Sequence, residues 1–116
     1  MSWRVVEILF VNTKLAKELA DERTILRRYG PDNGRRICLR LAQLMSAENL
    51  ETLRFLPQLR AHELAGDRAG QISVDVKHPR RLLLLPDHAE VPRNPDGGLD
   101  WKRITRVKVL GIIDTH

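Results

Sequence analysis

The stretch HELAGDRAGQISVDVKHPRRLLLL (residues 62–85) contains strand patterns joined by short turns, and it decides the fold expected for the whole chain. Residues 62–65 predict a brief strand, and the Gly-Asp-Arg-Ala-Gly segment at 66–70 has the chemistry of a hairpin turn. Polar and apolar residues then alternate over 71–77, which indicates a half-buried antiparallel strand. After a His-Pro turn, four consecutive leucines at 82–85 predict a central strand that is covered on both faces.

The residues before this stretch predict one strand and then a layer of helices. Residues 5–11 are rich in β-branched and aromatic side chains, as strands are. Helical spacing of apolar residues follows, first from a cap at Thr13 to a Gly-Pro pair, and then after a cap at Asp32. Ser46 is the expected cap of a shorter third helix that a proline ends.

The second of these helices carries an apolar stripe and a run of arginines. The stripe is expected to be buried, and its members are Ile37, Leu41, Leu44 and Met45. The arginines are expected to lie away from the centre of the stripe, and they are Arg35, Arg36 and Arg40. A solvated face is the simpler interpretation of this run, and contact with a nucleic acid or an acidic protein segment is the functional one.

The end of the chain predicts a long loop and a last strand. Residues 86–103 include three prolines and few apolar side chains, which is typical either of a functional loop or of a disordered excursion. Trp101 is expected to anchor the far end of this loop to the body of the domain. Val107, Val109 and Ile113 then alternate with other residues, so we expect a closing strand in which these three share a face.

In chain order, these patterns predict an α+β fold in a single domain that spans residues 1–116. An N-terminal strand and two to three helices precede a mainly antiparallel sheet, with a long loop before its last strand. A chain of 116 residues is long enough to bury a core without disulfides or a structural metal. The 42% hydrophobic and 30% charged content is that of a soluble globular protein.

Charge and cysteine content restrict the partners and the compartment. The net charge of +5 comes largely from arginine and favours an anionic partner, either nucleic acid or an acidic protein. Cys38 is the only cysteine, which excludes an intramolecular disulfide and a zinc site built from cysteines. Glu7 interrupts the apolar run near the N-terminus, so we expect a strand there rather than a signal peptide. No run has the length of a membrane span, and the chain is expected to be cytoplasmic with no membrane contact.

The polar residues contain no motif for metal, nucleotide or serine-hydrolase chemistry. The four histidines have neither HxxxH nor HExxH spacing, and neither a P-loop nor a GxSxG sequence is present. We therefore expect no metal and no cofactor. Metal-free RNA cleavage fits the remaining residues, because histidines can transfer protons and arginines can stabilise charge on the phosphate. His62, Arg81 and His116 lie at the ends of predicted strands, where such side chains can meet.

The segment HELAGDRAGQISVD, followed by PRRLLLL and a terminal strand that ends Asp-Thr-His, resembles the RelE/ParE superfamily of toxins, specifically its HigB-type members. The order of elements agrees over nearly the whole chain. The resemblance implies a RelE-like fold and a ribosome-dependent endonuclease that cuts mRNA and inhibits translation without a metal. It also implies a cognate antitoxin, commonly a HigA-like helix-turn-helix protein, whose complex with the toxin binds operator DNA.

The resemblance further implies roles for individual residues. The candidate catalytic residues are His62, Arg81, Asp114 and His116. The candidate RNA contacts are Arg68, Arg80 and Ser73. Within the first set, Arg81 matches an arginine that contacts the scissile phosphate, and Asp114 is expected to orient His116.

Two positions depart from the HigB pattern. Ala65 stands where such sequences often have a lysine, and Thr115 stands where they often have a tyrosine. The first change removes a phosphate contact, and the second removes a stacking platform worth about 1–3 kcal/mol per base. Two alternatives therefore stay open: a non-enzymatic toxin of this fold that inhibits DNA gyrase, or a degenerate toxin that acts only in antitoxin binding and operon repression.

Overall fold

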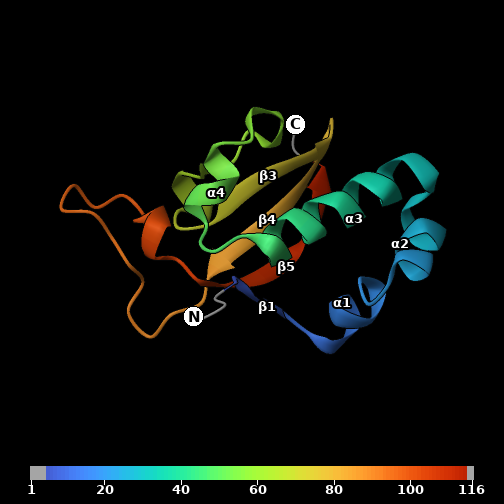
Figure 1. Cartoon of the computed structure of the whole chain (residues 1–116), viewed down its shortest axis with the longest axis horizontal. Coiled ribbons are helices and arrows are strands. Elements are labelled where there is room, and N and C mark those ends of the chain that lie inside the picture. The colour runs from blue at the N-terminus through green and yellow to red at the C-terminus, as the bar shows by residue number, and fades with distance from the viewer. Residues whose placement is uncertain (1–4, 115–116) are drawn as a thin grey trace.

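A computed structural model describes residues 5–114, in which α3 lies across one face of a five-stranded sheet (Figure 1). The strands, in spatial order, are β1 (Glu7–Phe10), β5 (Arg106–Asp114), β4 (Arg80–Pro86), β3 (Ile72–Lys77) and β2 (His62–Glu63). β1 runs parallel to β5, and the other neighbouring strands pair in antiparallel fashion. The α+β class and the mainly antiparallel sheet predicted from the sequence are therefore confirmed.

The α-helices lie between β1 and β2 in the chain, and short 3-10 turns precede β2 and lie between later strands. The α-helices are α1 (Thr13–Glu18), α2 (Glu22–Tyr29), α3 (Pro31–Ser46) and α4 (Glu51–Arg54). The 3-10 turns are η1 (Pro57–Leu59), η2 (Gly66–Arg68) and η3 (Trp101–Arg103). Within residues 5–114, no helix is long and apolar enough to cross a membrane.

Two helices begin differently from the sequence prediction. Asn12 caps α1, because its Oδ1 accepts a hydrogen bond of 2.8 Å from the backbone N–H three residues further on, and Thr13 becomes the first helical residue. Gly30, and not Asp32, precedes α3. The first residue of α3 is Pro31, a position that suits proline because the N–H there has no helical acceptor.

The first predicted helix is divided in two, and the third is shorter than expected. Asp21 separates α1 from α2 and caps α2 by accepting a hydrogen bond of 2.8 Å from the Thr24 backbone N–H. That bond lowers the pKa of the Asp21 carboxyl. Ser46 is the last residue of α3 and does not cap α4, since α4 begins only at Glu51.

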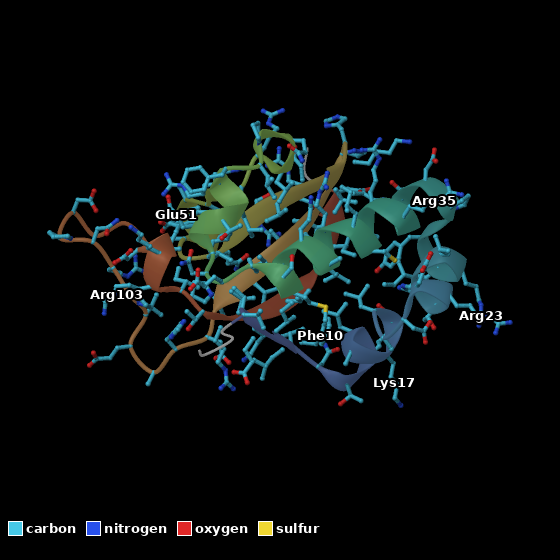
Figure 2. The ribbon with its side chains drawn as sticks, viewed as in Figure 1. Phe10, Lys17, Arg23, Arg35, Glu51 and Arg103 are labelled. Atoms are coloured by element: carbon cyan, nitrogen blue, oxygen red, sulfur yellow. The ribbon has the colours of Figure 1, made fainter. Side chains whose placement is uncertain are left out.

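The hydrophobic core lies between α3 and the sheet. Its largest fully buried side chains include Ile37, Leu44, Leu50, Leu53, Leu59, Ile72, Leu82, Leu84, Ile104 and Val107. Each such side chain stabilises the fold by about 1.5–3 kcal/mol. Two predictions for α3 are wrong: Met45 is 60% exposed, and Arg40 is only 4% exposed. Figure 2 shows Arg35 on the outside of this helix, as expected.

β4 is the central strand of the sheet, and β5 beside it contains a bulge. Leu83 is buried on one face of β4, while Leu82 and Leu84 are buried on the other, so the prediction of a strand covered on both faces is confirmed. Leu84 pairs with Val109 but Leu83 pairs with Gly111, which leaves one extra residue in β5. The extra residue reverses the alternation beyond it.

The bulge changes which residues of β5 share a face. Ile112 pairs with Leu82 and therefore lies on the same side as Val107 and Val109, in contact with the core. The expected grouping of Ile113 with the two valines is wrong for this reason. Asp114, two residues beyond Ile112, follows it onto the side of the sheet that α3 covers.

The segment between β4 and β5 is packed and hydrogen-bonded. Arg93 and Leu99 form a β-bridge, and the Leu99 N–H donates to Oε1 of Glu63 in β2 at 3.2 Å. Leu99 and Trp101 are buried, so the predicted anchor at Trp101 is confirmed. The far end of the segment is therefore anchored to the domain, while most of residues 89–97 are exposed.

Candidate functional site

The strand register brings several of the predicted site residues to one face of the sheet. Ile72 and Val74 of β3 point toward α3, so Ser73 and Asp75 between and beyond them point away from it. His62 pairs with Ser73 across the β2–β3 ladder, and Arg81 pairs with Asp75 across the β3–β4 ladder. We call the side of the sheet opposite α3, with these four polar residues, the outer face.

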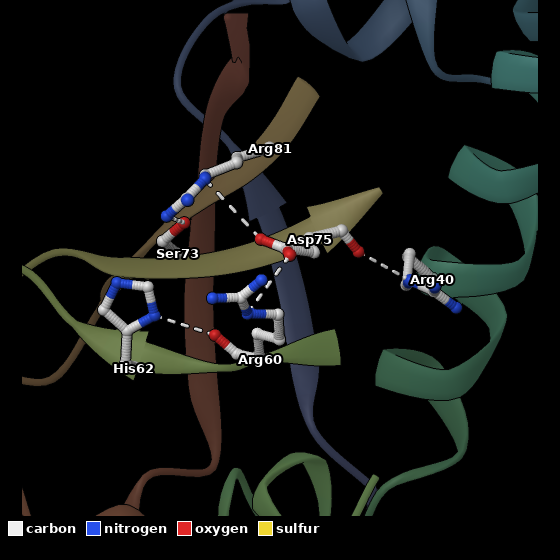
Figure 3. Close-up of polar contacts among 6 residues, drawn as sticks. All are labelled: Arg40, Arg60, His62, Ser73, Asp75 and Arg81. Atoms are coloured by element: carbon white, nitrogen blue, oxygen red, sulfur yellow. Dashed lines mark hydrogen bonds and ion pairs between the residues drawn. The ribbon is translucent and has the colours of Figure 1, made fainter. Parts of the chain in front are cut away.

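Asp75 is the centre of the polar contacts on the outer face (Figure 3). Its Oδ1 lies 3.5 Å from Nε of Arg81, and its Oδ2 lies 3.8 Å from Nε of Arg60, which precedes β2. The Asp75 side chain is 23% exposed and that of Arg81 is 27% exposed. Two guanidinium groups around one carboxylate leave a net positive charge, and both ion pairs are long enough for the arginines to keep donors for an anion.

Ser73 supports Arg81 and does not offer a surface to a ligand. Its side chain is fully buried, and its Oγ accepts a hydrogen bond of 3.5 Å from Nη1 of Arg81. Ser73, a predicted RNA contact, is thus not exposed on the surface of the domain. The hydroxyl and the Asp75 carboxylate together hold the Arg81 side chain from two directions.

His62 is exposed, and a backbone contact determines which of its ring nitrogens carries the proton in the neutral form. Nδ1 lies 2.7 Å from the carbonyl oxygen of Arg60. A carbonyl oxygen can only accept a hydrogen bond, so Nδ1 carries a proton and donates it. In the neutral ring the lone pair is then on Nε2, which leaves that nitrogen available as a proton acceptor.

Arg60 contributes to the site through both its backbone and its side chain. It is the non-glycine residue with positive φ among those described, with φ 46° and ψ 42° at the end of η1. This left-handed conformation costs about 1–2 kcal/mol for a residue with a Cβ. Its carbonyl orients His62 while its guanidinium pairs with Asp75. Backbone strain at a residue with two such contacts marks it as part of the site.

Replacing Arg60 by glycine or by alanine is expected to separate the effect of its side chain on binding from the effect of its backbone strain on stability. Both variants remove the guanidinium, so each should bind single-stranded RNA about threefold to tenfold more weakly, as for one contact of about 1 kcal/mol. Glycine removes the left-handed strain and alanine keeps it, so Arg60→Gly should be the more stable variant by about 1 kcal/mol. Urea unfolding and fluorescence anisotropy measure the two effects, and equal stabilities with unequal affinities would contradict this assignment.

Two other predicted residues, Arg80 and Asp114, do not lie on the outer face. Arg80 and Asp114 are paired across β4 and β5 with Nε and Oδ1 3.5 Å apart, on the side of the sheet that carries α3. There they line a shallow hollow with Arg28 and Tyr29 of α2. Asp114 and Arg81 therefore lie on opposite sides of the sheet, because the bulge in β5 turns Asp114 to the face that α3 covers.

Two further predicted residues have less defined roles. Arg68 lies exposed in η2, within the hairpin turn where it was expected. His116 lies outside the described residues, so the structure gives it no position.

Within residues 5–114, no group of three or more His, Cys, Asp or Glu side chains is arranged to hold a metal ion. Burial raises the pKa of the Cys38 thiol, which keeps it protonated.

Sequence reasoning missed two residues of the outer face, although each had a signal. Asp75 alternates with Ser73 on the polar side of a predicted strand, so the two were expected to share a face with the other polar residues there. Arg60 is a basic residue only two positions before His62, where the predicted strand begins. Neither position was singled out, because an acidic residue in a strand and a basic residue before one are ordinary on protein surfaces.

The chain was compared with protein-family models, curated proteins and solved structures, and no significant match was found in any of the three comparisons.

Proposed function

We propose that the outer face binds the phosphodiester backbone of RNA and that the chain is a metal-independent endoribonuclease. The observation that carries this proposal is that Arg60 and Arg81 both pair with Asp75, while His62 contacts the Arg60 backbone on the same side of the sheet. A proton acceptor and two phosphate-binding forks are what cleavage by the RNA's own 2′-hydroxyl requires. The net positive charge of the chain favours the same anionic substrate.

In the proposed reaction, Nε2 of His62 accepts the proton of the 2′-hydroxyl as its oxygen attacks phosphorus. Arg81 and Arg60 donate hydrogen bonds to the non-bridging oxygens, whose negative charge increases as the new bond forms. The bond from phosphorus to the 5′-oxygen then breaks, and that oxygen takes up a proton. The products are a 2′,3′-cyclic phosphate and a 5′-hydroxyl. By the resemblance, His116 is the proposed donor of that last proton.

The resemblance to HigB-type toxins supplies the proposed biological setting. We propose a RelE-like fold, a cytoplasmic site of action on ribosome-bound mRNA, and a role as the toxin of a type II toxin–antitoxin pair. The proposed partner is a HigA-like helix-turn-helix antitoxin that brings the complex to operator DNA. The segments HELAGDRAGQISVD and PRRLLLL support this setting, and the position of Arg81 in the second segment supports the assignment of the phosphate contact.

Expression of the chain in bacteria, with and without the neighbouring reading frame, tests this function. Translation is expected to stop within minutes, and primer extension should find mRNA cut within the translated frames, with products that end in 2′,3′-cyclic phosphate. Purified protein with ribosomes and mRNA should give the same cuts when EDTA removes transition metals. Enough magnesium is kept in excess of EDTA to hold the ribosome together. Supercoiling inhibition without RNA cuts would instead identify a gyrase inhibitor, and no growth defect would identify a degenerate toxin.

A further inference from the structure

Arg40 is a buried charge in the middle of α3. It is 4% exposed, and it follows Ile37 by three residues and precedes Leu44 by four, so it occupies the stripe that faces the sheet. Burial and the nearby charge of Arg36 lower the pKa of Arg40, and the charge of Asp75 acts in the opposite direction. A guanidinium in such a position costs free energy that an apolar side chain of the same length does not.

The guanidinium of Arg40 extends from α3 to the strand that carries the outer face (Figure 3). Its Nε donates a hydrogen bond of 2.7 Å to the backbone carbonyl of Asp75, and its Nη1 donates one of 3.1 Å to Oε1 of Gln43. Asp75 is also the residue at which the β3–β4 register shifts, between its pair with Arg81 and the next pair at Lys77. Arg40 therefore holds the backbone at the irregular point of the ladder.

We infer that Arg40 is a positioning residue for the outer face, which acts through Asp75 on the two arginines that bind phosphate. This inference rests on the proposed function. Arg40 itself does not touch the proposed substrate. The backbone of Asp75 is bonded from one side of the sheet by Arg40, and its carboxylate is paired on the other side with Arg60 and Arg81. Moving that backbone by a fraction of an ångström moves the carboxylate that aligns both guanidiniums.

The energetics distinguish this role from simple packing. Replacing a buried ion by an apolar residue of similar volume is often neutral or stabilising for folding. If Arg40 served stability alone, methionine would serve as well, and binding of RNA would not change. A positioning role also predicts that an Arg40→Met variant keeps its fold, but that the alignment of Arg81 is lost and binding of RNA is weaker.

The test measures binding of a 2′-deoxy single-stranded oligonucleotide, which cannot be cleaved, to Arg40→Met, Arg40→Lys, Arg81→Gln and the double variant Arg40→Met/Arg81→Gln. Arg40→Met should bind about fivefold more weakly, and the loss in the double variant should be smaller than the sum of the two single losses, because Arg81 is one of the two contacts through which Arg40 acts. Arg40→Lys, which keeps a charge and a donor, should recover part of the loss. Arg35→Met, on the exposed side of the same helix, is the control and should change binding by less than about twofold.

Two outcomes overturn the inference: unchanged binding by Arg40→Met, or losses that add fully in the double variant. Failure of the proposed function is seen separately, as absence of binding by the parent chain. In that case the Nε–Hε NMR signals of Arg60 and Arg81 still decide the inference. Faster hydrogen exchange of both signals in Arg40→Met, and not in Arg35→Met, supports positioning, and unchanged exchange overturns it.

Discussion

Replacing Arg81 by glutamine is expected to lower the rate of RNA cleavage by about two to three orders of magnitude, the loss typical of one preorganised donor to a developing oxyanion. Arg81 is restrained from two sides, because its guanidinium lies 3.5 Å from the Asp75 carboxylate and 3.5 Å from the buried Ser73 hydroxyl. Glutamine retains a hydrogen-bond donor but has no charge and no fork. Single-turnover cleavage of an mRNA fragment on ribosomes measures the effect.

The matched control is the neighbouring residue. Arg80 has the same side chain one position earlier in β4, but it points to the side of the sheet that carries α3 and pairs there with Asp114. Arg80→Gln is therefore expected to change the cleavage rate by less than about threefold, because its lost ion pair is partly exposed. A large loss in Arg80→Gln with a small one in Arg81→Gln would show that the reaction takes place on the side of the sheet that carries α3, and not on the outer face.

The predictable part of the fold follows from alternation and helical spacing. The polar and apolar alternation of β3 and the leucine run of β4 were enough to predict two strands joined by a turn and the burial of β4 on both faces. These signals are strong because burial on one face, or on both, leaves a direct trace in the residue types. Helix boundaries were less well predicted, since Asn12 and Thr13 are both good caps and only the chain's path selects between them.

The parts that were missed depend on single-residue irregularities. A bulge in β5 turns Asp114 away from Arg81, and its one sequence signal is Gly111, an isolated glycine in a strand pattern beside the extra residue. Arg40 lies in the buried stripe by spacing, but its charge argued for the surface, as the usual preference of arginine does. Its partner is a backbone carbonyl, which no side-chain pattern can reveal. In both cases the departure from the rule lies next to the candidate site, where such departures are concentrated.

Replacing His62 by asparagine is expected to lower cleavage by about two to four orders of magnitude, the contribution usual for a positioned general base. The asparagine amide N–H₂ lies where Nδ1 of histidine lies, so it can keep the hydrogen bond to the Arg60 carbonyl while supplying no proton acceptor at Nε2. The local backbone contact is thereby preserved. The affinity for a 2′-deoxy oligonucleotide should change by less than about threefold, in contrast to Arg81→Gln.

The pH profile gives the sharper test of the same residue. Catalysis by a general base gives a cleavage rate that rises with pH and then becomes constant, and we expect such a limb in the parent. In His62→Asn that limb of the profile should disappear, and the small remaining rate should be flat over the same range. Persistence of the limb in the asparagine variant would show that another group accepts the proton, and would leave the outer face with phosphate binding alone.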